Sequence, residues 1–277
     1  MNKTTHTALD VVFYIIVFLL LQLITNMAFG VAAMWHDGQT WSAIGQAMAK
    51  GTLPLTPKVV VAAMVASSLL TLLLFVQRRW VTASRSWLVS HPWGVLAWTA
   101  TLALGTILPS EWMVEQLQVS MPDATEHLLE SIMHEPSGYL AIGILGPVAE
   151  EVVFRGAVLR TLLQAFSPKA HWLAIFLSAA LFGAVHLNMA QFVHALPIGL
   201  LLGWMFYRTG SIMPGLVFHW VNNTVAYIAF NLMPQMADGK LIDLFHGNTR
   251  TLWMAMGFSL CIILPSIFQL HLRMRKE

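Results

Sequence analysis

Three ionisable residues lie within six consecutive positions of a strongly apolar stretch: Glu150, Glu151 and Arg155. On a helix, Glu151 and Arg155 share one face and can form an ion pair. Glu150 is rotated by about 100° from Glu151 and points elsewhere. Since a charge at the centre of a spanning helix costs roughly 2.5–3.5 kcal/mol, such a cluster needs compensation. Two interpretations stay open: a buried ion-pair cluster that joins helices, or a free carboxylate on Glu150 that acts as a general base.

A histidine follows in the next apolar stretch, in the segment Phe182-Gly-Ala-Val-His186. We expect it inside a spanning helix. A lone histidine there is often a hydrogen-bonded core residue, so His186 by itself does not establish a function. Gly183 and Ala184 are small, which allows another helix to approach closely at this point.

A third apolar stretch contains His219 and Asn223, which are four residues apart and share a helical face. Two such groups on one stripe indicate either a polar cavity or hydrogen bonds between helices. Asn222 lies about 100° around the helix, and we expect it to form a helix–helix hydrogen bond. A free glutamate, two histidines and an asparagine at interior depth are together typical of proton pathways, ion sites and hydrolytic sites.

The composition places these residues in a membrane protein. The 277-residue chain is 57% hydrophobic and 10% charged, whereas a soluble domain has about 25% charged residues. The net charge of +2 is spread over scattered basic residues, so no nucleic-acid partner is expected. Cys261 is the single cysteine, which excludes an intrachain disulfide and a thiolate metal site. The expected surroundings are a lipid bilayer.

A helix needs about 20 mostly apolar residues to cross a bilayer. The sequence predicts an all-α, polytopic membrane bundle of about eight transmembrane helices, at residues 9–33, 58–77, 92–108, 138–162, 170–188, 192–207, 211–233 and 252–270. We expect three parts. Transmembrane helices and an outer amphipathic segment occupy 1–137, the helices with the polar residues occupy 138–233, and an outer loop with the C-terminal transmembrane helix occupies 234–277.

Lysine and arginine are retained on the cytoplasmic side of membrane proteins. With both termini in the cytoplasm, the outer side holds few of the 15 Lys and Arg residues, namely Lys50, Lys58, Lys240 and Arg250. This distribution predicts cytoplasmic termini and an even number of spans. The N-terminal apolar run is too long for a cleaved signal peptide, so we expect it to remain as the first span.

The connection at residues 109–137 contains acidic residues and no lysine or arginine. Within it, Asp123 and Glu126 have the spacing of a helix-capping box after Pro122. The apolar residues that follow line one helical face: Leu128, Leu129, Ile132 and Met133. We expect a short amphipathic helix on the outer surface. A role as a plain connector is the simpler interpretation, and a role in gating access of the substrate is the alternative.

The three motifs, EExxxR at 150–155, FxxxH at 182–186 and HxxxN at 219–223, occur in an order that resembles the CPBP intramembrane proteases. That family contains the type II CAAX prenyl endopeptidases and bacterial bacteriocin-processing and immunity proteins. The resemblance covers about residues 143–227. It implies that Glu150 activates the attacking water, His186 holds that water, and His219 and Asn223 face the scissile carbonyl. Asn223 would donate to the developing oxyanion.

The same resemblance gives supporting roles to three residues. Glu151 and Arg155 would shape their helix, and Phe182 would pack near His186. Glu150, His186 and His219 could together bind Zn²⁺, which takes nitrogen and oxygen ligands. A metal-free route, with Glu150 as the base, fits equally well, so the cofactor question stays open.

The expected function is therefore that of a CAAX-protease-like intramembrane endopeptidase in the inner membrane of a bacterium. Its substrate would be a protein with a prenylated C-terminal motif, a leader-bearing peptide or a membrane protein. Two other classes stay open. A proton-coupled transporter would also use intramembrane Glu, His and Arg, although its usual inverted repeat is not visible in the sequence. A non-catalytic binding or immunity protein is the other.

Overall fold

The computed structural model describes residues 3–81, 85–233 and 240–274, and within these the regular elements are helices. In chain order they are α1 (Lys3–His36), α2 (Trp41–Lys50), α3 (Pro57–Gln77), α4 (Arg85–Val89), α5 (Trp93–Gln116), α6 (Asp123–His134), η1 (Leu140–Leu145), α7 (Gly146–Glu151), η2 (Val152–Leu159), α8 (Arg160–Ala165), η3 (Pro168–Ala170), α9 (His171–Ala184), α10 (Met189–Thr209), α11 (Met213–Leu232), η4 (Leu241–Phe245) and α13 (Thr249–Arg273). The prediction of an all-α membrane bundle is confirmed. Residues 234–239 of the predicted outer loop lie outside the described residues.

Each of the eight predicted spans overlaps helical structure. Five helices, α1, α3, α5, α10 and α13, are long and apolar enough to cross a membrane. The remaining three predicted spans are shorter, more polar or interrupted. They correspond to α9, to α11 and to the stretch from η1 to α8. Helix α9 has only 14 residues, the stretch from η1 to α8 is divided and contains Glu150, Glu151 and Arg155, and α11 contains His219 and Asn223.

The fourth predicted span is not a regular α-helix. Two π-helical stretches, η1 and η2, flank the short α-helix α7. A π-helix widens the turn and leaves backbone groups less well paired, and it often occurs at functional sites. Ser178 of α9 donates to the Phe154 carbonyl of η2 at 3.0 Å, which satisfies one such group from a neighbouring helix. The helix that holds Glu150 and Glu151 is therefore distorted on both sides.

Helices α9 and α10 form an antiparallel hairpin that packs closely. Asn188 caps α10 by accepting from the Gln191 amide. A Cβ on Gly183 would lie 2.8 Å from the Phe192 ring, and one on Gly199 would lie 2.9 Å from the Ala179 Cβ atom. Small residues thus set the distance between the two helices, as the sequence predicted for Gly183.

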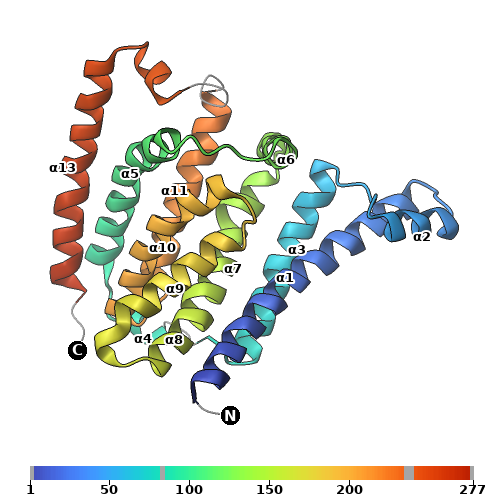
Figure 1. Cartoon of the computed structure of the whole chain (residues 1–277), viewed down its shortest axis with the longest axis horizontal. Coiled ribbons are helices and arrows are strands. Elements are labelled where there is room, and N and C mark those ends of the chain that lie inside the picture. Colours follow the sequence, from blue (N-terminus) through green and yellow to red (C-terminus); the bar gives the residue numbers. More distant parts are fainter. Residues whose placement is uncertain (1–2, 82–84, 234–239, 275–277) are drawn as a thin grey trace.

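Helix α6 lies across the end of the bundle opposite to the start of α1 and the end of α13 (Figure 1). Its amphipathic character was predicted correctly, since Ile132 and Met133 are buried. The predicted capping box is wrong, because the N-cap is Pro122 and Asp123 already lies in the first turn. Tyr227 of α11 donates to the Glu135 carbonyl at 3.2 Å, which fixes the end of α6.

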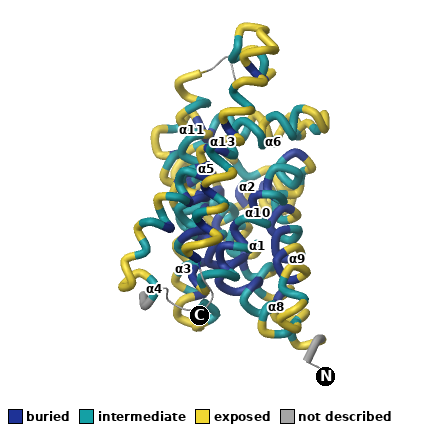
Figure 2. Tube along the Cα trace, turned by 90° about the vertical axis from the view of Figure 1, so that its left-hand side faces the viewer, coloured by how far each residue is buried: buried dark blue, intermediate teal, exposed yellow. Residues whose placement is uncertain are grey.

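Burial is concentrated at the centre of the bundle, whereas the helix ends are exposed (Figure 2). The predicted ion pair is present and buried. Arg155 Nη1 donates to Glu151 Oε1 at 2.7 Å, and the two side chains are 1% and 0% exposed. Arg155 also contacts the Gly199 carbonyl at 3.5 Å and stacks over the Phe182 ring at 4.5 Å. One cation therefore joins η2, α9 and α10.

We predict that Arg155→Ala and Glu151→Ala each reduce the free energy of unfolding by about 3–5 kcal/mol, because each leaves an unpaired buried charge. The midpoint of thermal unfolding in detergent measures this loss. Arg250→Ala, which removes an exposed arginine on α13, is the control and should leave the midpoint unchanged. Normal midpoints in both core variants would show that the pair does not stabilise the bundle.

We also predict that Gly199→Val destabilises the protein by about 1–3 kcal/mol, because the new side chain meets Ala179 and crowds the Arg155 guanidinium. Gly257→Val on α13 is matched in chemistry and helical setting, and a Cβ there has nothing within 4 Å. The same unfolding measurement compares the two. Equal midpoints would refute close packing of α9 against α10 at Gly199.

Candidate active site

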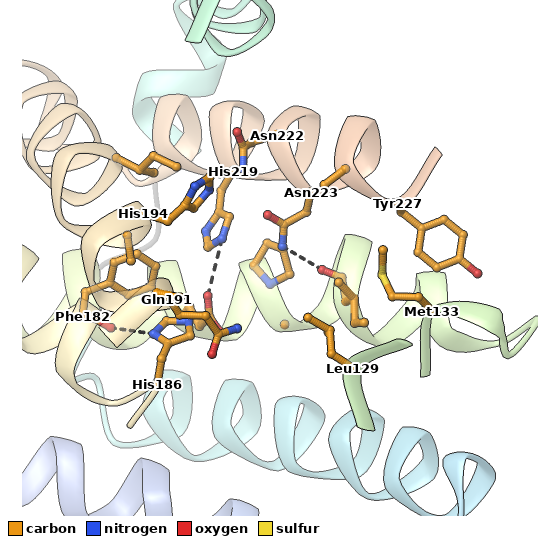
Figure 3. Close-up of a pocket in the computed structure, with 18 of the residues that line it drawn as sticks. Leu129, Met133, Phe182, His186, Gln191, His194, His219, Asn222, Asn223 and Tyr227 are labelled. Carbon is orange, nitrogen blue, oxygen red and sulfur yellow. Dashed lines mark hydrogen bonds and ion pairs between the residues drawn. The ribbon is translucent and has the colours of Figure 1, made fainter. Parts of the chain in front are cut away.

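A single cavity of about 500 Å³ gathers the four residues singled out as catalytic (Figure 3). Glu150 comes from α7, His186 follows the end of α9, and His219 and Asn223 come from α11. The wall also includes residues of α3, α5, α6, η1 and α10. Polar groups that are up to 73 residues apart in sequence, between 150 and 223, thus face one space.

The two consecutive glutamates have different surroundings, as their angular separation predicted. The Glu151 side chain is fully buried against Arg155, whereas the Glu150 side chain is 24% exposed and lines the cavity. Glu150 Oε2 lies 3.5 Å from His219 Nε2. The Glu151 carboxylate is thus buried in the core, and the Glu150 carboxylate remains accessible from the cavity.

His219 lies between the two carboxylates. Its Nε2 atom faces Glu150, and its Nδ1 atom lies 3.4 Å from Glu151 Oε1. Within the described residues, neither His219 Nδ1 nor Glu151 Oε2 makes a hydrogen bond. Glu151 also lies against Gly215 in the first turn of α11, since a Cβ there would collide with its carboxylate. The positive end of the helix dipole favours an anion at that place.

The prediction that His186 lies inside a spanning helix is wrong, because α9 ends at Ala184. His186 instead lies in the short turn before α10, where Leu187 has a left-handed φ of 58°. Its Nδ1 atom lies 2.9 Å from the Phe182 carbonyl. Since a carbonyl can only accept, Nδ1 carries the proton, and a neutral ring keeps a lone pair on Nε2. The predicted packing of Phe182 near His186 is present, with ring centroids 5.4 Å apart.

Asn223 lines the cavity and donates to the Ile142 carbonyl of η1 at 3.0 Å. This hydrogen bond orients the amide and leaves its second N–H for another acceptor. Asn222, which we expected to join two helices, is instead a 6% exposed residue of the cavity wall. The rotation of about 100° between the two asparagines does not take Asn222 away from the cavity, because the wall wraps around α11.

Sequence reasoning missed several polar residues of the cavity, among them Glu111 on α5, and Gln191 and His194 on α10. Gln191 and His194 are three residues apart, so they share a helical face, and this spacing could have identified them. Glu111 gave no such signal, since it lies at the end of a predicted span among other acidic residues. Its Oε1 atom lies 4.0 Å from His194 Nδ1.

The residue types Glu150, His186 and His219 suit a zinc ion. Within the described part of the chain, however, no three side chains of the His, Cys, Asp or Glu types converge as a metal site requires. Glu150 and His219 face each other, but His186, although its Nε2 lone pair is free, does not join them in such a group. The residues as arranged do not fit the ion, so the reaction is derived below without it.

Residues 134–225 match the family model described as type II CAAX prenyl endopeptidase Rce1-like. The matched segment is about a third of the chain and contains all four candidate catalytic residues. No curated protein and no solved structure matches this chain. The family model confirms, over residues 134–225 of this membrane protein, the resemblance to the CPBP and CAAX proteases that the three motifs indicate.

Proposed function

We propose that this protein is an intramembrane endopeptidase that hydrolyses a peptide bond with water activated by Glu150. The substrate is a membrane-associated or C-terminally processed protein or peptide. The observation that supports this proposal is the convergence of Glu150 from α7, His186 from the α9–α10 turn, and His219 and Asn223 from α11 on one cavity. Hydrolysis requires a base, a positioned water and a donor to the oxyanion around one carbonyl.

The first step uses a water molecule held by Glu150 and by His186 Nε2. Glu150 takes one proton, and the water oxygen bonds to the scissile carbonyl carbon. The free N–H of Asn223 donates to the carbonyl oxygen as it becomes negative. His219 Nε2 faces the same side and holds Glu150 in place at 3.5 Å.

The second step breaks the carbon–nitrogen bond. Glu150 returns its proton to the departing nitrogen, which leaves as an amine, and the other product is a carboxylic acid. The acid then gives its proton to the amine, directly or through water, so that the final products are a carboxylate and an ammonium group. Glu151 and Arg155 take no part in bond making. They hold His219 from the far side, since Glu151 Oε1 lies 3.4 Å from His219 Nδ1.

The cavity wall also fits a substrate that comes from the membrane. Met64 of α3 and Leu129 and Met133 of α6 are apolar lining residues, and such surfaces accept apolar side chains. We place both termini in the cytoplasm of a bacterial cell, which puts α6 on the outer side. The start of α1 and the end of α13 at one end of the bundle agree with termini on one side of the membrane (Figure 1), and the distribution of Lys and Arg indicates which side it is.

We predict that Glu150→Gln reduces the rate of cleavage by about 10²–10⁴-fold, because the amide cannot accept the proton. Mass spectrometry of a membrane-peptide library incubated with the purified protein in detergent measures cleavage. His186→Ala should also be strongly impaired.

The control is Glu126→Gln, which neutralises an exposed α6 carboxylate outside the cavity and should retain activity. All variants should keep the thermal unfolding midpoint of the wild type. Normal turnover by Glu150→Gln would exclude Glu150 as the base. Absence of cleavage by the wild type would oppose the protease function and favour a binding or transport role.

We predict that a chelator leaves the cleavage rate unchanged, because no three ligand side chains converge in the described residues. The assay compares untreated protein, chelator-treated protein and treated protein with added zinc. Loss of activity that zinc restores would contradict the metal-free route. It would require the Nε2 atom of His186 to come together with Glu150 and His219, and the hydrogen bond from Nδ1 to Phe182 could persist.

A further inference from the structure

The cavity has a second carboxylate that the proposed reaction does not use. Glu111 lies in the last turns of α5, lines the same cavity as Glu150, and has a side chain that is 50% exposed. Its ion-pair contact in the described residues is with His194 of α10, which is charged only when protonated, at 4.0 Å between Glu111 Oε1 and His194 Nδ1. That distance exceeds a hydrogen bond. The Glu111 carboxylate is therefore held loosely and can contact a bound molecule.

Apart from its histidines, the charged side chains that line the cavity are carboxylates. Its described lining includes Glu111 and Glu150 but no lysine or arginine. The nearest buried cation, Arg155, is 1% exposed and bound to Glu151, so its charge is already balanced. The segment at 109–137 begins near Glu111, contains no lysine or arginine, and places Leu129 and Met133 of α6 in the cavity wall.

This arrangement bears on which substrates can bind. A negative group near Glu111 and Glu150 meets two carboxylates and no compensating cation, and such repulsion is strong where water is partly excluded. A lysine or arginine of the substrate gains an ion pair in the same place. The cavity thus disfavours an acidic segment, including a free C-terminal carboxylate near Glu111, and favours a basic one.

We propose that Glu111, backed by His194, is a specificity-determining residue that selects a substrate with a lysine or arginine close to the cleaved bond. This inference rests on the proposed protease function and adds a substrate class to it: a basic peptide segment cut internally.

The test uses a peptide that the wild-type protein cleaves. Each residue near the cleaved bond is replaced in turn by Lys, Gln or Glu, and kcat/KM is measured at a pH of about 8, where an ordinary histidine is neutral. At one position, we expect the Lys peptide to exceed the Glu peptide by about tenfold or more. Glu111→Lys should reverse that order. Glu126→Lys makes the same charge change in the same acidic segment, outside the cavity, and should keep the wild-type order.

A second measurement separates the two proposals. Binding of fluorescent Lys and Glu peptides to Glu150→Gln, and to the same variant with Glu111→Lys, does not require cleavage. A preference for Lys that Glu111→Lys reverses supports the inference even if no peptide is cut, in which case only the protease function fails. The same charge preference with and without Glu111→Lys, or no preference in the wild type, overturns the inference and leaves the protease function standing.

Discussion

The rest of the structure depends on one constraint: a charge in the interior of a membrane bundle must have a partner. Arg155 meets it through Glu151 at 2.7 Å, through the Gly199 carbonyl and through the Phe182 ring. Because these partners lie on the same helical stretch and on both helices of the α9–α10 hairpin, the requirement to neutralise Arg155 fixes how three segments pack. It also commits Glu151 to the core, which leaves Glu150 as the carboxylate that faces the cavity.

His219 connects this core to the site. It lies within 3.5 Å of both glutamates, so the buried pair on one side orients a histidine whose other side faces Glu150. A change in the pair would therefore affect activity through position and stability. A change at Glu150 would affect the chemistry directly.

The small residues and the irregular helix give the site its space. Gly183 and Gly199 allow α9 and α10 to approach closely, and Gly215 lets α11 lie against Glu151. The π-helical stretches on both sides of α7 change the direction of the side chains along the fourth span. Hydrogen bonds from α11 to η1 and to the end of α6 then hold the cavity wall in place.

The sequence by itself determined the class of the protein, the approximate ranges of eight helices, the Glu151–Arg155 pair and the four candidate residues. Apolar runs and i, i+4 spacing depend only on contacts within one segment, and they can be read without a structure. The tertiary structure decided that His186 lies in a turn, that His219 lies between two carboxylates, and that Glu111 and His194 share the cavity. Each of these features depends on how side chains of different helices pack together. Spacing along the sequence does not predict that packing.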